Sequence, residues 1–87
     1  MVYEIDFDKH FDKSIDKEPG FHKYLKKFNT EVIPNLVRDP LNGKNIKKLK
    51  GNLEGLYRYR IGDYRIFYTV NIKTVVLLEV VARKNAY

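Results

Sequence analysis

The sequence contains no cysteine. Disulfide bonds and cysteine-ligated zinc are therefore excluded, and a reducing compartment is compatible with the chain. No apolar run approaches the ~20 residues that are needed to cross a bilayer. The acidic residues Glu4, Asp6 and Asp8 make the N-terminal stretch unlike a signal peptide. We therefore expect a cytoplasmic protein that does not act in a membrane.

Several catalytic signatures are also missing. Residues 51–55 lack the Gly-Lys-Ser/Thr ending of a phosphate-binding loop. His10 and His22 are isolated and are not at ligand spacing with carboxylates, so we expect them on a helix surface rather than in catalysis. No serine or cysteine can be argued to be a nucleophile. The sequence predicts neither a metal site nor a cofactor.

The distribution of charge is the first positive signal. The 87 residues, 44% of them hydrophobic, are enough for one small domain, residues 1–87. Residues 1–43 contain seven Lys/Arg and eight Asp/Glu, whereas residues 44–87 contain ten and three. The net charge of +6 therefore comes entirely from the second half. General solubility would spread this charge evenly, so the asymmetry favours a polyanionic partner, nucleic acid before a membrane surface.

A β-hairpin is the strongest structural signal. Apolar or aromatic residues alternate with arginine before and after Gly62-Asp63, a typical two-residue hairpin loop. With that loop, Arg60 lies opposite Arg65, a pairing that costs a few tenths to about 1 kcal/mol unless an anion lies between the two. Because side chains alternate between faces, one face is expected to be apolar and the other basic. The apolar face collects Tyr57, Tyr59, Ile61, Tyr64, Ile66 and Tyr68; the basic face collects Arg58, Arg60, Arg65 and Phe67.

Two helices are expected before this hairpin. Phe7, Phe11 and Ile15 form one helical stripe, which Pro19-Gly20 ends. A second helix is expected from Phe21 to about residue 39, with an apolar stripe at helical spacing. Pro34 removes one backbone hydrogen bond to Thr30 and predicts a bend or restart. Asp6 or Asp8 is expected to cap the first helix.

The remaining strands complete an α+β domain. We expect strands at residues 2–6, 46–53 and 74–82, with a turn at Asn71-Ile72-Lys73. A three-residue turn there would place Arg65 opposite Glu79. Val75, Leu77, Glu79, Val81 and Arg83 would then share the basic face, and Val76, Leu78, Val80 and Ala82 would join the apolar face. The expected order is βααββββ, with a two-helix hairpin packed on one face of a mostly antiparallel four- to five-stranded sheet.

The chemistry of the basic face suits RNA. Arginine forks bind phosphate and aromatic rings stack on unpaired bases. The same cluster could support metal-independent RNA cleavage, because attack by a ribose 2′-OH develops charge on the phosphoryl oxygens that fixed cations stabilise. Lys47, Lys48 and Lys50 are expected nearby as RNA-binding groups.

Three stretches carry a resemblance to a known family: Leu49-Lys50-Gly51, the hairpin at residues 57–68 and the tail at residues 82–87. Together they resemble the RelE/ParE toxin superfamily, and its RelE branch in particular. The resemblance implies the toxin of a type II toxin–antitoxin pair that enters the ribosomal 30S A site and cuts mRNA there, leaving a 2′,3′-cyclic phosphate. It also implies a cognate acidic RelB-like antitoxin and a toxin that is monomeric by itself.

The resemblance also implies roles for individual residues. Lys50 matches the basic residue before the family's glycine, and Arg58 and Arg60 match the basic pair on the first hairpin strand. Arg65 and Arg83 match two further arginines. The catalytic set implied is Arg58, Arg60, Arg65, Arg83 and Tyr87, with Tyr87 stacking on the substrate base.

One departure from the family pattern opens alternatives. RelE itself has lysines where this chain has Arg58 and Arg60, and arginine, with a pKa above ~12, cannot serve as a general base. Tyr87, Lys48, Lys50 or the substrate itself could take that role. Two other functions stay open: a ParE-like toxin that binds DNA gyrase without cutting RNA, and a degenerate homologue that binds only RNA or its antitoxin.

Overall fold

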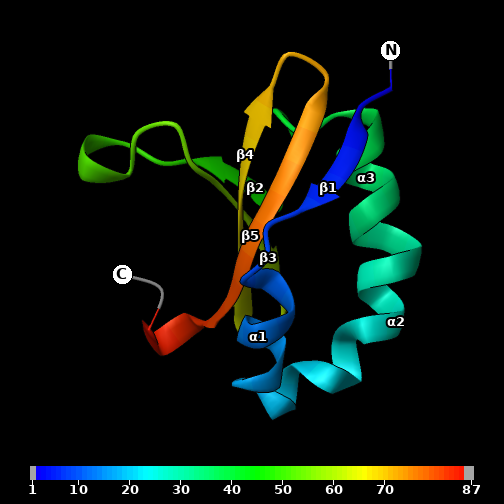
Figure 1. The fold of residues 1–87 in the computed structure, drawn as a ribbon, viewed down its shortest axis with the longest axis vertical. Coiled ribbons are helices and arrows are strands. Elements are labelled where there is room, and N and C mark those ends of the chain that lie inside the picture. Colours follow the sequence, from blue (N-terminus) through cyan, green and yellow to red (C-terminus); the bar gives the residue numbers. More distant parts are fainter. Residues whose placement is uncertain (1, 86–87) are drawn as a thin grey trace.

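The computed structural model describes residues 2–85, which form one five-stranded sheet with its helices on one face (Figure 1). The strand order is β1-β5-β4-β3-β2. The bounds are β1 Glu4–Phe7, β2 Ile46–Lys48, β3 Tyr57–Ile61, β4 Tyr64–Asn71 and β5 Thr74–Ala82. β1 pairs with β5 in parallel, and the other pairs are antiparallel. The predicted α+β architecture is confirmed.

The central hairpin has the register expected from its loop. Ile61 pairs with Tyr64, Arg60 with Arg65 and Tyr57 with Tyr68. Gly62 has a φ of +57°, and no non-glycine residue among those described has a positive φ. A positive φ at the first loop position alone is the pattern of a type II′ turn, which matches the twist of the two strands.

The helices follow the predicted outline but differ in where α1 begins, in its cap and in the regularity of the second run. α1 spans Phe11–Asp16, and Phe7 belongs to β1 instead of the helix. The expected cap by Asp6 or Asp8 is wrong, because His10 is the N-cap residue of α1 and no side chain among the described residues caps the helix. The Asp8 carboxylate instead accepts the backbone N–H of His10 at 3.0 Å. The second helical run is built from four consecutive pieces: η1 Pro19–Tyr24, α2 Leu25–Lys27, η2 Phe28–Val32 and α3 Ile33–Arg38.

Pro34 explains the irregular part of this run. The segment η2 is a π-helical turn that ends two residues before Pro34. Because proline has no N–H, the carbonyl of Thr30 cannot receive its regular bond, and a wider turn is one way to accommodate the gap. The expected disturbance at Pro34 is therefore present, in the form of a π turn within a helical run that continues to Arg38.

The core lies between the helices and the apolar face of the sheet. The helical stripe contributes Phe21, Phe28, Val32 and Leu36, all at most 5% exposed. The sheet contributes the six predicted hairpin residues, of which Ile66 and Tyr68 are fully buried. The hydroxyl of Tyr68 donates to the carbonyl oxygen of Pro40 at 2.7 Å, and burial raises the pKa of Tyr68 above its ordinary value.

The predicted register of β5 is wrong. The turn has two residues, so Asn71 pairs with Thr74, and a bulge at Leu78 then shifts the ladder so that Phe67 pairs with Glu79 and Arg65 with Val81. An inserted residue exchanges the faces of everything on one side of it. Val75 and Leu77 are consequently fully buried in the core instead of lying on the basic face. Val76 pairs with Thr69 on the opposite face.

The other strand correction concerns residues 46–53. β2 ends at Lys48, and Gly51–Leu53 form a short 3-10 turn, η3. Residues 49–56 leave the sheet as a loop on the side opposite to α2 and α3 (Figure 1). Within residues 2–85, no helix is both long and apolar enough to cross a membrane.

Candidate functional site

The face of the sheet opposite to the helices, here called the basic face, carries most of the predicted site residues. Two cross-strand rows define it. One row is Lys47–Arg58–Phe67–Glu79 and the other contains Arg60, Arg65 and Val81. Since directly paired residues point to the same side, the side chains of Arg58, Arg60 and Arg65 share this face, as predicted.

Arg58 and the three predicted lysines are brought together in one hollow. Lys47, Lys48, Lys50 and Arg58 line an open depression of about 440 Å³ beside Leu49 and Leu53. The Nε atom of Arg58 is buried and has no hydrogen-bond partner among the described residues, so part of this guanidinium's capacity to donate is unused. A buried cationic donor without an acceptor costs about 1–3 kcal/mol or more. We call this depression the lysine hollow. Its cationic lining and the unused donor of Arg58 are suited to binding an anion.

Six cations on or beside the basic face have no carboxylate partner among the described residues. Within residues 2–85, none of Lys47, Lys48, Lys50, Arg58, Arg60 and Arg83 forms an ion pair with another described residue. Mutual repulsion among such groups is relieved when a polyanion binds and its counterions are released. The electrostatics favour a partner with several negative charges.

Arg65 differs from the other arginines because it is only 7% exposed. Its Nη1 donates to the carbonyl oxygens of Tyr64 at 2.9 Å and Gly62 at 3.3 Å. The guanidinium is thus folded back onto its own hairpin turn, whereas Arg60, directly opposite, is exposed. The backbone carbonyls of the turn therefore take part in stabilising the buried Arg65 guanidinium.

Arg83 joins the same turn through its backbone. β5 ends at Ala82, and Arg83 begins the short 3-10 turn η4, Arg83–Asn85. The Arg83 N–H donates to the carbonyl oxygen of Asp63 at 2.7 Å. With Asp63, Tyr64, Ala82 and Lys84, Arg83 lines a second open hollow of about 470 Å³. Arg58 and Arg83 therefore line different hollows, and Tyr87 lies outside the described residues.

A small apolar cluster on the basic face was not predicted. Leu49 and Phe67 are 4% and 7% exposed and pack with Leu53, Leu56 and Val81. The loop after β2 thus covers Phe67, which the sequence had suggested as an aromatic on an open face. The sequence pattern that could have predicted this cluster is the spacing of Leu49, Leu53 and Leu56, three or four residues apart within an otherwise polar stretch.

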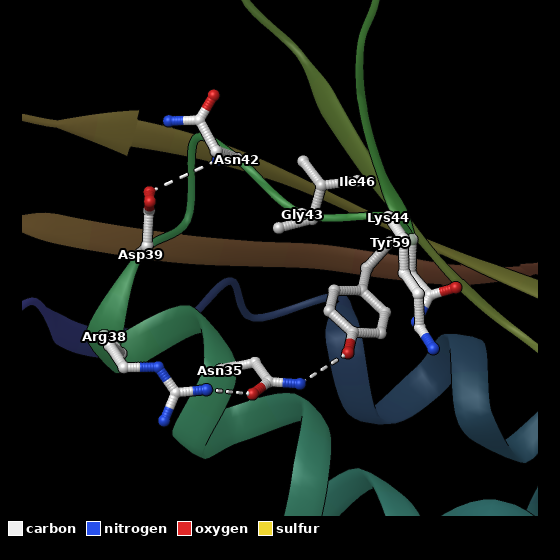
Figure 2. A pocket seen from close by; sticks show the side chains of 9 residues that line it. Asn35, Arg38, Asp39, Asn42, Gly43, Lys44, Ile46 and Tyr59 are labelled. Atoms are coloured by element: carbon white, nitrogen blue, oxygen red, sulfur yellow. Dashed lines mark hydrogen bonds between the residues drawn. The ribbon is translucent and has the colours of Figure 1, made fainter.

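A third hollow, of about 190 Å³, lies where α3 leads into β2 (Figure 2). Asn35 links its walls, because its Nδ2 donates to the Tyr59 hydroxyl at 2.9 Å and its Oδ1 accepts from Arg38 at 2.6 Å. Asp39 Oδ1 accepts the backbone N–H groups of Leu41 and Asn42. These polar groups are used in holding the α3–β2 connection, and this hollow is not part of the basic face.

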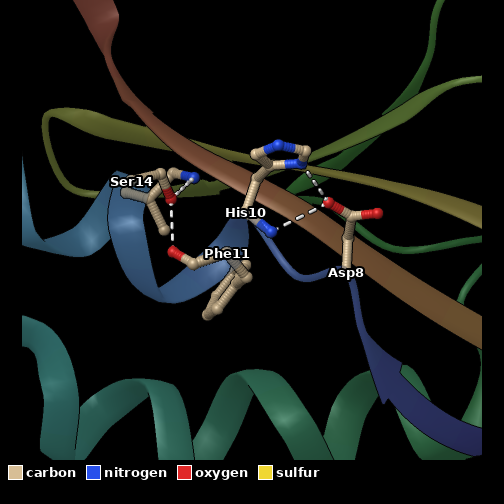
Figure 3. A network of polar contacts seen from close by, with 5 residues as sticks. Asp8, His10, Phe11 and Ser14 are labelled. Carbon is tan, nitrogen blue, oxygen red and sulfur yellow. Dashed lines mark hydrogen bonds and ion pairs between the residues drawn. The ribbon is translucent and has the colours of Figure 1, made fainter.

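The histidine at the start of α1 belongs to a polar network with a structural role (Figure 3). The backbone N–H of His10 and its Nδ1 both contact Asp8 Oδ2, and these hydrogen bonds lower the pKa of the Asp8 carboxyl. Ser14 Oγ donates to Phe11 O at 2.6 Å and accepts the Val80 N–H at 2.9 Å. Both interactions occupy the hydroxyl, so Asp8, His10 and Ser14 do not form a nucleophilic triad.

These features define the class of protein: a small α+β domain with a cationic sheet face, on which Lys47, Arg58 and Arg60 have no ion-pair partner within residues 2–85. Among residues 2–85, no group of three or more His, Asp or Glu side chains is placed to hold a metal ion. The chemistry available on the basic face is electrostatic stabilisation and phosphate binding by fixed cations.

Comparisons with known proteins identify the family. A family model described as the ParE toxin of the type II toxin–antitoxin system parDE matches residues 4–87. The toxin RelE3 of Methanocaldococcus jannaschii is 36% identical over 83 residues, which cover 93% of this chain and 91% of that toxin. The chain belongs to the RelE/ParE family of toxins from type II toxin–antitoxin systems, and is a RelE-family toxin.

Solved structures of the family share the fold. The RelBE2 toxin–antitoxin complex of Mycobacterium tuberculosis has a chain that aligns with a TM-score of 0.74 at 28% identity, covering 95% of this chain and 100% of that chain. A chain of the RelB–RelE complex from Methanococcus jannaschii aligns with a TM-score of 0.70 at 34% identity, covering 94% of each chain.

Proposed function

We propose that this RelE-family toxin is a ribosome-dependent endoribonuclease that cuts mRNA in the A site of the 30S subunit and so inhibits translation. The observation that carries the proposal is the cluster of unneutralised cations on the basic face, with Arg58 and three lysines around one hollow and Arg60 in the next row. Such a cluster matches the phosphates of RNA, and its catalytic contribution requires no metal.

The proposed reaction is attack by a ribose 2′-OH on the adjacent phosphorus. The O2′–P bond forms as the bond to the 5′ oxygen of the next nucleotide breaks, leaving a 2′,3′-cyclic phosphate and a 5′-hydroxyl. Arg58 and Arg60 stabilise the charge on the phosphoryl oxygens, and Arg65 supports this arrangement from the hairpin turn. Arg83 serves as phosphate clamp or as general acid towards the leaving oxygen, and Tyr87 stacks on the base or accepts the 2′ proton. Lys47, Lys48 and Lys50 hold the flanking backbone.

We further propose a cytoplasmic antitoxin partner that is acidic where it covers the basic face. The chains compared above from M. tuberculosis and M. jannaschii come from complexes of RelE with RelB. Charge complementarity predicts capture of the toxin that weakens as ionic strength rises. The toxin can be co-expressed with the protein of the flanking reading frame and pulled down at ~50 and ~500 mM salt, to compare how much partner is retained. Equal retention at both salt concentrations would argue against electrostatic capture.

The test of cleavage is primer extension on programmed ribosomes. Wild-type toxin should produce mRNA ends within the A-site codon, and an Arg60→Ala/Arg83→Ala variant should reduce cleavage by at least ~100-fold, in line with the loss of oxyanion-type stabilisation. Lys26→Ala/Lys27→Ala, which removes two exposed charges from α2, is the matched control and should cleave normally. Absence of cleavage by the wild type, or undiminished cleavage by the arginine variant, would refute the nuclease.

The second candidate is a toxin that binds DNA gyrase without cutting RNA. Two observations favour it. The matching family model is described as the ParE toxin. Arg58 and Arg60 occupy positions where RelE has lysines, and arginine cannot act as a general base for RNA cleavage as a lysine could. In this case expression of the toxin causes DNA breaks and filamentation while mRNA remains intact. The same cells, assayed for both DNA and mRNA integrity, distinguish the two functions.

A further inference from the structure

The turn between β3 and β4 presents three consecutive carbonyl groups to the two arginines that flank it. Gly62 and Tyr64 accept from Arg65 Nη1, at 3.3 and 2.9 Å, and Asp63 between them accepts from the Arg83 backbone N–H at 2.7 Å. One guanidinium and one amide therefore hold the same short segment of backbone. The backbone of Arg83 and the guanidinium of Arg65 therefore share one attachment point in the turn.

The same turn is held from the helix side. A Cβ at Gly62 would collide with the ring of Tyr24, so the turn lies directly against this side chain. Tyr64 makes edge-on contacts with Phe21 and Tyr24, and Phe21 and Tyr24 are tilted against each other, with ring centroids 5.5 to 6.2 Å apart. Aromatic rings thus pack against the turn from the helix side, while the hydrogen bonds from Arg65 and Arg83, next to the pairing of Tyr64 with Ala82, hold it from the other side.

The burial of Arg65 distinguishes it from its neighbours. At 7% exposure its guanidinium has little surface to offer a phosphate, whereas Arg60 and Arg83 are exposed. A buried charge is retained when it is well hydrogen-bonded. The carbonyls of the turn supply such bonds, and removal of Arg65 would leave them without these donors.

We propose that Arg65 is a positioning residue, which clamps the Gly62–Asp63 turn and thereby sets the place of Arg83. Arg58, Arg60 and Arg83 remain the groups that meet the phosphate. This inference rests on the proposed function for its consequence in RNA binding. Its structural part, the coupling of Arg65 to the Arg83 amide, stands independently of any substrate.

The first experiment measures amide hydrogen exchange by NMR in the complete chain. In Arg65→Met, which keeps an apolar stem, the Arg83 N–H should exchange at least ~10-fold faster because its local opening becomes easier. The Tyr3 N–H, bonded to Val37 O at 2.8 Å at the other end of the molecule, is the control for general destabilisation and should change little. Arg60→Met should leave both amides unchanged. Equal acceleration of both amides in Arg65→Met, or no acceleration at Arg83, overturns the proposal.

The second experiment is a double-mutant cycle on the salt dependence of single-stranded RNA binding. Each lost phosphate contact lowers the slope of log K against log salt by ~0.7. If Arg65 acts through Arg83, the slope for Arg65→Met/Arg83→Met should fall no further than the slope for Arg83→Met alone. The slope for Arg60→Met/Arg83→Met should fall by ~1.4, because two phosphate contacts are lost. A loss of ~1.4 in the Arg65/Arg83 double variant would make Arg65 an independent phosphate ligand.

Arg65→Gln covers the case in which Arg65→Met does not fold. The glutamine amide can still donate hydrogen bonds to the carbonyls but carries no charge. A positioning role therefore predicts that the Arg83 N–H stays protected from exchange nearly as in the wild type, whereas a purely ionic role predicts that this protection is lost. If the wild type binds no RNA, the proposed function fails while the exchange measurements still decide the role of Arg65.

Discussion

Replacing Gly62 by alanine tests the geometry of the hairpin turn on which the arginine arrangement depends. Two separate costs are expected. At a φ of +57° an alanine is in the left-handed region, which costs about 1–2 kcal/mol. The new Cβ would also collide with the hydroxyl and ring of Tyr24, and forced overpacking costs about 1–3 kcal/mol. The expected loss is about 2–5 kcal/mol from a typical domain stability of roughly 5–15 kcal/mol.

Two other glycines separate these costs. Gly51 has a φ of +69° and open space around its would-be Cβ, so Gly51→Ala should show the conformational cost of about 1–2 kcal/mol alone. At Gly20 the would-be Cβ collides with the Tyr64 hydroxyl without a positive φ, so Gly20→Ala should show a contact cost alone. The sum of the two controls should approximate the effect at Gly62.

The assay is urea unfolding followed by circular dichroism, read as a change in midpoint at constant m. A double variant with Tyr24→Leu should recover about 1–3 kcal/mol of the Gly62→Ala loss, because the collision is removed. If Gly62→Ala costs no more than Gly51→Ala, or if Tyr24→Leu recovers nothing, then the turn is not packed against Tyr24 as described.

Further predictions concern buried and paired polar groups. Tyr68→Phe removes the donor to Pro40 O and should cost about 1–2 kcal/mol, or a fall of roughly 4–16 °C in Tm, while Tyr57→Phe should change Tm little. Because burial raises the pKa of Tyr68, its stabilising effect is complete below the unfolded value of about 10 and declines as pH rises from there towards the folded value. The alkaline loss of stability should therefore be smaller in Tyr68→Phe, and an unchanged alkaline melt would contradict the burial argument. Hydrogen bonds from His10 lower the pKa of Asp8 from 3.8, so its contribution is present above about pH 4 and is lost as pH falls through the folded value. Chemical denaturation between pH 2 and 6 should show a weaker acid dependence in Asp8→Asn, and an identical profile would remove Asp8 from the explanation.

Local patterns in the sequence determined the central hairpin and the identity of the core. The Gly62-Asp63 loop sets the register of residues 57–68, because a two-residue loop leaves one way to pair the strands. Alternation then assigned Tyr59, Ile66 and Tyr68 to the buried face and Arg58 to the other, and the structure agrees. The concentration of basic residues in the second half likewise predicted the cationic face.

Tertiary structure decided what each arginine can do. The bulge at Leu78 was not visible as a pattern, because an inserted residue changes register through long-range pairing between β4 and β5. The loop carrying Leu49 and Leu53 covers Phe67, and Arg65 turns back to the carbonyls of its own hairpin. A sequence shows which side of a strand a residue occupies, but the direction and burial of a long side chain depend on neighbours that only the folded chain brings together.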